Sequence, residues 1–193
     1  MVIMDCSENI PQIFLSTDRI HLRRLNPSDL DLLRRLFCAD DMMKYLGSPW
    51  TEEEVNGVLE EWQREWGKNN YWYGVMVEKQ SGASVGIAGI TEDTNPDEPG
   101  LEFSWFVLPE FQNQGFAAEI TQAMMQFVFE TIKKERFFAS THPNNPASNA
   151  VLQKLGFRNL GLRYQFIDYL PGFDKQVVWE YLRSDWLNKY PEE

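Results

Sequence analysis

The alternation of apolar and polar residues predicts extended strands along much of the chain. Ile20 to Leu25 alternates in this way, and the later segments combine apolar runs with flanking turn residues. The tetrapeptide at 80–83 contains Gly82 and is typical of a hairpin turn between two of these strands. The expected strands cover residues 20–25, 71–79, 84–91, 102–108, 136–141, 158–168 and 175–182.

Apolar residues at helical spacing predict helices between these strands. Thr51 and Glu54 have the spacing of a capping box, and Asn145 before Pro146 is typical of a helix start. Further helices are expected after Asn26, ending before Gly47, and from Phe116 or Ala117 to about 134. The order of elements indicates a mixed α/β fold.

The chain of 193 residues is long enough to bury one core, and it shows no repeat or low-complexity linker. Apolar residues make up 43% of it and aromatic residues 14%, which argues against disorder. We therefore expect one domain over residues 17–185, with an N-terminal extension (1–16) and a C-terminal tail (186–193).

The net charge of −11 disfavours nucleic acid and anionic membranes as partners. It suits a cationic substrate such as an amine, and it equally suits a protein kept soluble by its acidity. No signal peptide or membrane-length apolar run is recognised. Cys6 and Cys38 make no disulfide framework, and His21 and His142 no metal site, so we expect a cytoplasmic protein without a metal.

The segment from Gln112 to Ala117 follows an expected strand and opens a long expected helix. Unpaired N–H groups and a partial positive charge at a helix N-terminus bind phosphate without a lysine. Gly115 lets the backbone approach such an anion closely. An ordinary strand-to-helix turn would also account for this glycine. The segment is neither a P-loop nor a dinucleotide fingerprint.

This segment resembles the Gln/Arg-x-x-Gly-x-Gly/Ala signature of the GNAT acetyltransferase superfamily, with Gln112, Gly115 and Ala117 at the signature positions. The block 145–157, which ends in Leu-Gly-Phe, resembles a later helix of the family. The opening 17–25 resembles the branch that contains the ribosomal-protein N-terminal acetyltransferases. The resemblance implies an α/β (α+β) fold with a mostly antiparallel twisted sheet of six to seven strands and about four helices.

The resemblance further implies acetyl transfer from acetyl-coenzyme A (acetyl-CoA) to a primary amine in a ternary complex. Many relatives carry Arg-Gly-Lys-Gly where this chain has 112–115, so backbone amides from Gln114 to Ala118 are expected to hold the pyrophosphate. The expected coenzyme contacts are Phe106, Val107, Leu108, Gln112, Asn113, Gln114, Gly115, Phe116, Ala117, Ala118 and Asn145.

Two residues are candidates for the chemistry by the same resemblance. Glu102 would deprotonate the amine directly or through water, although it could also be a solvent-facing strand acid. Ser148 would hydrogen-bond the thiolate of the coenzyme, although serine is also common at a helix start. Many family members have a tyrosine acid where this chain has Leu152.

Three hypotheses remain open from the sequence. The first is an acetyltransferase acting on a protein N-terminus or a small amine. The second is a non-catalytic acyl-CoA-binding or interaction module, and the third is transfer of a larger acyl group such as succinyl. Each is compatible with a monomer or a homodimer.

Overall fold

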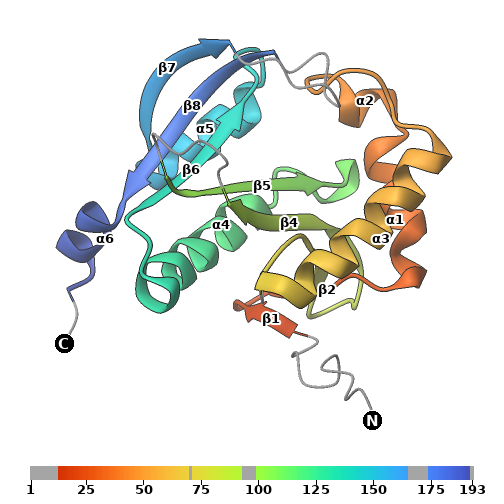
Figure 1. Cartoon of the computed structure of the whole chain (residues 1–193), viewed down its shortest axis with the longest axis horizontal. Coiled ribbons are helices and arrows are strands. Elements are labelled where there is room, and N and C mark those ends of the chain that lie inside the picture. Colours follow the sequence, from red (N-terminus) through yellow and green to blue (C-terminus); the bar gives the residue numbers. More distant parts are fainter. Residues whose placement is uncertain (1–12, 70, 93–98, 165–173, 192–193) are drawn as a thin grey trace, which may run out of the picture.

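The computed structural model describes residues 13–69, 71–92, 99–164 and 174–191. These residues form one sheet of eight strands in the order β1-β2-β3-β4-β5-β6-β8-β7 (Figure 1). Neighbouring strands are antiparallel except for the parallel pair β5 and β6. The strands are β1 (Ile13–Ser16), β2 (Ile20–Arg24), β3 (Gly74–Glu78), β4 (Ser84–Glu92), β5 (Leu101–Val107), β6 (Arg136–Thr141), β7 (Arg158–Tyr164) and β8 (Lys175–Leu182).

Six α-helices flank the sheet within the described residues. They are α1 (Leu30–Phe37), α2 (Asp40–Met43), α3 (Glu52–Asn69), α4 (Phe116–Gln126), α5 (Pro146–Leu155) and α6 (Arg183–Lys189). Short 3₁₀ turns, η2 (Pro27–Asp29) and η3 (Pro109–Phe111), precede α1 and α4, and a π-helical turn, η4 (Phe127–Ile132), continues α4. In these ranges no helix has both the length and the apolar composition of a membrane span.

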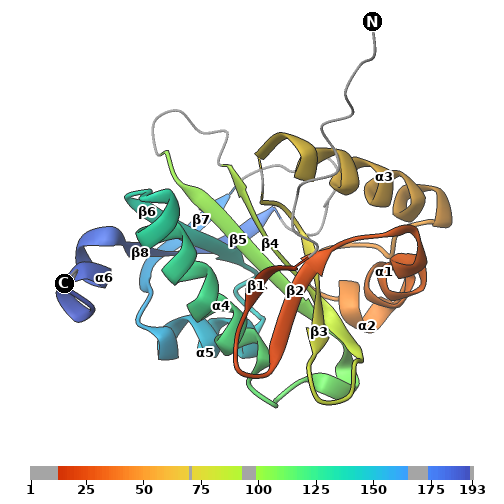
Figure 2. The same cartoon turned by 90° about the horizontal axis from the view of Figure 1, so that it is seen from below.

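The sheet separates two hydrophobic clusters. Figure 2 shows α1, α2 and α3 over one face, and α4 and α5 over the other. Neighbouring residues of β3 belong to different clusters, Val75 to the one under α1 and α3 and Met76 to the one under α4. This division follows from the alternation of side chains across a strand. The predicted mixed α/β, mostly antiparallel architecture is confirmed.

The expected number of strands was too low because β1 lies in the segment taken as an extension. Four residues are too short to show a strand pattern, and long-range contacts hold them in place. Leu15 pairs with Leu22 of β2, and the Phe14 ring packs edge-on against Trp66 and Phe127 at centroid distances of 5.1 and 4.7 Å.

The expected number of helices was also too low. The helix after Asn26 is divided, because Ala39 has extended backbone angles between α1 and α2. Helix α6 lies partly in the segment taken as a tail, where Trp186 packs on Phe129 and its indole donates a hydrogen bond to Glu130. The capping box of Thr51 and Glu54 is confirmed at the start of α3. The division into extension, domain and tail stays a prediction.

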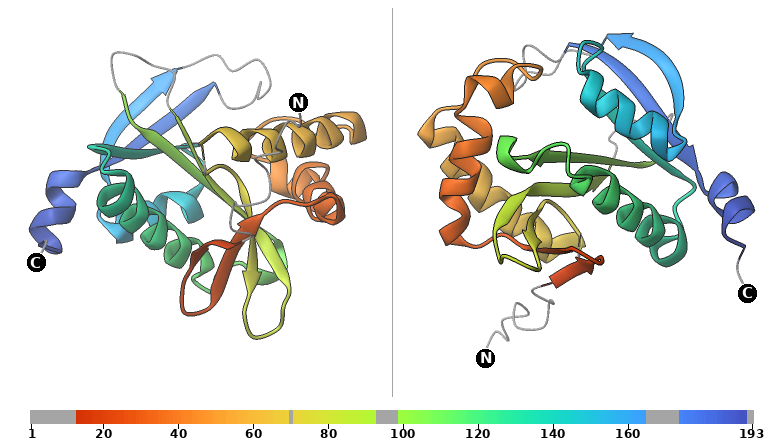
Figure 3. Two further views of the ribbon diagram at one scale, coloured as in Figure 1. Left: turned by 60° about the horizontal axis from the view of Figure 1, so that its bottom comes forward. Right: turned by 180° about the vertical axis from the view of Figure 1, so that it is seen from behind.

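The parallel strands β5 and β6 pair over two positions only and then separate (Figure 1). The paired residues are Leu101 with Phe137 and Glu102 with Phe138. Beyond them each strand keeps its other neighbour, since β4 pairs with β5 up to Val107 and β8 pairs with β6 up to Thr141. The sheet is therefore forked on the side where α4 and α5 begin, and the two helices run side by side from there (Figure 3, right).

Candidate functional site

The first turn of α4 has unpaired backbone donors. Gly115 is the residue before the helix, with φ of 85°, and no side chain caps this end. The first helical hydrogen bond runs from the Glu119 amide to the Gly115 carbonyl, at 3.1 Å. The amides of Phe116, Ala117 and Ala118 precede that bond and so have no helical acceptor. The sequence predicts an anion site at this uncapped helix start, and that role stays a prediction.

The side chains of the turn are tied back to its own backbone. The Gln112 side-chain Nε2 donates to the Val107 carbonyl at 3.0 Å, and the Gln114 side-chain Nε2 donates to the Glu110 carbonyl at 2.9 Å. Asn113 has a left-handed φ of 58°, a conformation that asparagine tolerates. These two glutamine side chains thus fix the shape of the turn, and its backbone amides are the donors left for an anion.

Arg19 lies against this turn although it is 95 positions away from Gln114. Its guanidinium donates to the Gln114 carbonyl at 3.0 Å and to the Glu119 carboxylate at 2.6 Å, and it covers the Phe116 ring at 4.7 Å. Glu119 also accepts from the Thr17 hydroxyl and the Arg19 amide. Burial would raise the pKa of Glu119, but these hydrogen bonds hold it below its usual value. From the sequence, Arg19 belonged only to the 17–25 resemblance and had no role of its own.

The fork exposes one edge of β5. The Leu108 amide bonds the Val85 carbonyl at 3.0 Å, so backbone groups of Phe106 and Leu108 turn toward β4. Those of Trp105 and Val107 consequently turn toward β6. The side chains of Val107, Leu108 and Phe116 are at most 8% exposed. Of the predicted coenzyme contacts on this strand, Val107 has its backbone at the fork, and Trp105, which sequence reasoning missed, lies there as well.

Glu102 is the last residue of β5 that pairs with β6, so it stands at the point of the fork. Its side chain shares a face of the strand with Ser104 and Phe106, on the side of α1 and α3. The hydroxyls of Ser104 and Tyr73 are hydrogen-bonded, and Tyr73 stacks on Trp62 at 4.2 Å. The predicted base therefore lies next to an aromatic surface that comes from α3 and the segment just before β3.

The first turn of α5 is capped by its own chain. The Asn145 side chain accepts from the Ser148 amide at 3.2 Å, which confirms Asn145 as a helix cap. Ser148 is half-buried, and no described group is hydrogen-bonded to its hydroxyl. Asn149 anchors the turn, since its side chain bonds Thr141 of β6 at 2.6 Å and the Trp179 indole of β8 at 3.2 Å.

His142 links this turn to the helices on the other side of the fork. Its ring stacks on Tyr45, just after α2, with centroids 5.6 Å apart. The Nδ1 atom accepts from the Asn144 amide at 3.1 Å, so a neutral ring carries its proton on Nε2. From the sequence, His142 was considered only as a metal ligand and was assigned to no site. The stacked pair is a contact that only the tertiary structure reveals.

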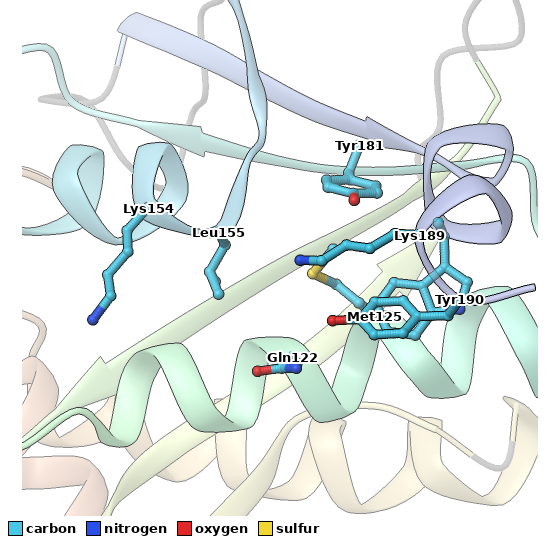
Figure 4. A pocket seen from close by; sticks show the side chains of 8 residues that line it. Gln122, Met125, Lys154, Leu155, Tyr181, Lys189 and Tyr190 are labelled. Atoms are coloured by element: carbon cyan, nitrogen blue, oxygen red, sulfur yellow. The ribbon is translucent and has the colours of Figure 1, made fainter.

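The concave surface near α6 is separate from these residues. A pocket of about 70 Å³ lies between α4, α5 and α6, and burial raises the pKa of its Tyr181 hydroxyl (Figure 4). None of the predicted site residues lines it. The lining residues are Gln122, Met125, Lys154, Leu155, Tyr181, Trp186, Lys189 and Tyr190.

Comparison with known proteins identifies the fold and the family. The family model for the acetyltransferase (GNAT) domain matches residues 19–158. The uncharacterized N-acetyltransferase YoaA of Bacillus subtilis is 25% identical over 158 residues, which are 79% of this chain and 87% of that protein.

Solved structures agree with this match. A GNAT-family acetyltransferase from Bacillus anthracis superposes with a TM-score of 0.74 at 21% identity, over 88% of this chain and 98% of that one. The ribosomal-protein-S5-alanine acetyltransferase of Vibrio fischeri does so with a TM-score of 0.68 at 19% identity, over 89% and 97%. The resemblance inferred from the sequence is confirmed, and the chain belongs to the GNAT acetyltransferase family, whose members use acetyl-CoA.

Proposed function

We propose that this protein transfers the acetyl group of acetyl-CoA to a primary amine. The observation that carries the proposal is the open first turn of α4 beside the fork between β5 and β6. Among the described residues, a helix end without a side-chain cap and a strand edge without a neighbouring strand lie next to each other there. A coenzyme with a pyrophosphate at one end and an amide-containing arm leading to its thioester needs both.

The residues fit the coenzyme through their backbones. The amides from Gln114 to Ala118 would hold the pyrophosphate, helped by the partial charge of the helix end. The N–H groups of Trp105 and Val107 would bond the amides of the arm, as a neighbouring strand would do. When bound, the coenzyme supplies an acyl group activated as a thioester.

The amine would approach from the face of β5 that carries Glu102. A carboxylate there would take a proton from the ammonium form, directly or through water, so that nitrogen can attack. The Ser148 hydroxyl at the start of α5 would donate a hydrogen bond to the leaving thiolate. The net charge of −11 favours a cationic acceptor. Protein N-termini and small amines both satisfy this chemistry.

The test has a binding arm and a turnover arm. Isothermal titration with acetyl-CoA is expected to show binding, and addition of a panel of primary amines is expected to release free thiol. No binding at millimolar coenzyme would refute the proposal. Running succinyl-CoA in parallel distinguishes an acetyl site from one for a larger acyl group.

Replacement of the predicted base sharpens the turnover arm. Glu102→Gln is expected to lower kcat about a hundredfold, the lower end of what general-base catalysis contributes, with coenzyme affinity unchanged. Glu60→Gln, at an exposed position of α3, is the matched control and should leave both unchanged. Equal kcat in the wild type and Glu102→Gln would remove Glu102 from the mechanism.

A second candidate function is a non-catalytic acyl-CoA-binding module. Leu152, at the position of the family's tyrosine acid, is fully buried, and the pyrophosphate turn has no cationic side chain of its own. This reading expects coenzyme binding without thiol release for any amine. The same titration and amine panel therefore separate the two functions.

A further inference from the structure

We propose that Arg19 is a positioning residue of the coenzyme site, which orients the Gln114–Gly115 peptide so that its N–H faces the pyrophosphate. The inference rests on the proposed function. It assigns a role to a residue outside the 112–118 turn. Three contacts carry it: the bond to the Gln114 carbonyl, the ion pair with Glu119 and the packing over Phe116.

The orientation follows from the planarity of the peptide. In a trans peptide the carbonyl of one residue and the N–H of the next point in opposite directions. Arg19 Nη1 holds the Gln114 carbonyl at 3.0 Å, so the Gly115 N–H points away from Arg19. Glycine with a φ of 85° is otherwise free to rotate its flanking peptides. Arg19 therefore restrains the Gln114 carbonyl directly, which the two glutamine side chains of the turn do not do.

Arg19 also neutralises the negative charge of Glu119 near the proposed anion site. Glu119 is in the first turn of α4, close to where an anionic ligand would bind, and its carboxylate would repel that ligand. The guanidinium contacts the same carboxylate through Nε and Nη2, each at 2.6 Å. The pair is neutral as a unit, which leaves the partial positive charge of the helix end uncompensated.

The same contacts argue against Arg19 as a direct phosphate ligand. Nε and Nη2 are directed at Glu119, Nη1 at Gln114, and one face of the guanidinium lies 4.7 Å from the Phe116 ring centroid. Direct ligation would break this arrangement. Arg19 acts on the coenzyme through the backbone of Gly115.

The experiment measures binding of coenzyme A by isothermal titration to four proteins. Arg19→Gln is expected to bind about tenfold more weakly than wild type, the loss that corresponds to one hydrogen bond involving a charged group. Arg34→Gln removes an arginine from an exposed ion pair with Glu52 and should bind like wild type. The double variant Arg19→Gln/Glu119→Gln restores the charge balance without restoring the bond to Gln114, so it should stay weak.

Dephospho-coenzyme A keeps the pyrophosphate and lacks the 3′-phosphate, so it should show the same tenfold loss with Arg19→Gln. A loss that disappears with this ligand would overturn the inference in favour of a direct 3′-phosphate contact. Full recovery in the double variant would overturn it in favour of charge balance alone.

A readout without coenzyme keeps the inference independent of ligand binding. In ¹⁵N relaxation spectra, the Gln114 and Gly115 amides should become more mobile in Arg19→Gln and remain rigid in Arg34→Gln. Unchanged mobility together with unchanged affinity would refute the role of Arg19 alone. A wild-type protein with a rigid turn and no affinity for coenzyme A would refute the proposed function instead.

Should Arg19→Gln unfold, Arg19→Lys replaces it. Lysine keeps the charge but not the forked geometry of the guanidinium, so this variant is expected to bind coenzyme A more weakly than wild type.

Discussion

The helices α4 and α5 both start where β5 and β6 separate, but their first turns are built differently. Asn145 caps α5 by accepting from the Ser148 amide. Gly115 gives α4 no side-chain cap, and Arg19 holds the preceding carbonyl from outside. One helix has a side-chain cap in its first turn, whereas the first amides of the other have none.

The difference indicates a division of roles within one site. A capped helix start has lost a backbone donor to its own side chain, so in the proposed function α5 would contribute a side-chain hydroxyl, that of Ser148. An uncapped start contributes backbone donors and the helix dipole, which bind an anion without lysine or arginine as ligand. This division also shows how a chain with 112–115 as Gln-Asn-Gln-Gly would manage without the Arg and Lys of its relatives.

The largest expected effect comes from adding a second acidic residue, one without an arginine partner, to the first turn of α4. Ala118→Glu is expected to weaken coenzyme A binding at least about a hundredfold, because like charges about 4 Å apart near a protein surface repel by about 4 kcal/mol. The same carboxylate suits the helix dipole, so thermal stability should be unchanged or slightly higher. Titration and thermal denaturation measure the two effects.

Ala150→Glu is the matched control, since it adds the same charge to an exposed position of α5 beyond its first turn. It should bind coenzyme A like wild type. If Ala118→Glu bound equally well, the first turn of α4 would not be the anion site.

The next effect concerns the hydroxyl at the start of α5. Ser148→Ala is expected to lower kcat about tenfold, the value of one charge-assisted hydrogen bond, with the affinity for acetyl-CoA unchanged. Stability should also be unchanged, because the Ser148 amide stays capped by Asn145. Thiol release kinetics check this, with Ser184→Ala on the exposed surface of α6 as control. An unaltered kcat would assign Ser148 to helix-start chemistry only.

The cap of α5 should contribute measurably to the free energy of unfolding. Asn145→Ala is expected to lower the free energy of unfolding by about 1 kcal/mol, the usual cost of losing an N-cap. Asn145→Asp keeps an acceptor for the Ser148 amide and should recover most of the loss. Urea denaturation measures both variants, and equal stability of all three proteins would contradict the capping role.

The smallest effect is the pH dependence of stability that Glu119, in the first turn of α4, contributes. The lowered pKa of Glu119 means that its contribution is fully present above the ordinary value of 4.5 and is lost as the pH falls through the folded value. Glu119→Gln should therefore be less stable than wild type at pH 7, by at most about 1 kcal/mol for so exposed a pair, and the difference should shrink toward pH 3.

Urea unfolding at several pH values tests this, with Glu60→Gln as the control. A stability difference that stays constant across the range would show that the Glu119 charge does not contribute.

Local signals predicted the helix starts well. Asn145 with Pro146, and Thr51 with Glu54, form caps from residues adjacent in sequence, so their geometry is contained in a short segment. Strands β6 and β8 were predicted with their observed bounds for the related reason that apolar positions followed by turn residues are a local pattern. The residues of the α4 turn were found through a family signature. Short-range physics alone left open whether the turn was an anion site or an ordinary strand-to-helix connection.

Long-range contacts decided the remainder. Strand β1 is too short to have a pattern of its own, and α6 depends on Trp186 packing against Phe129. The fork between β5 and β6 has no sequence signal, because pairing between parallel strands is set by how the whole sheet twists and packs.

The sequence by itself determined the family, the order of most elements and the uncharged character of the turn at 112–118. Only the tertiary structure decided that Arg19 lies against that turn and that Trp105 faces the fork. The physical reason is the distance along the chain over which each interaction acts. Caps and periodicity act within a few residues, whereas Arg19 reaches Gln114 because it directly precedes β2, a strand of the sheet on which α4 packs.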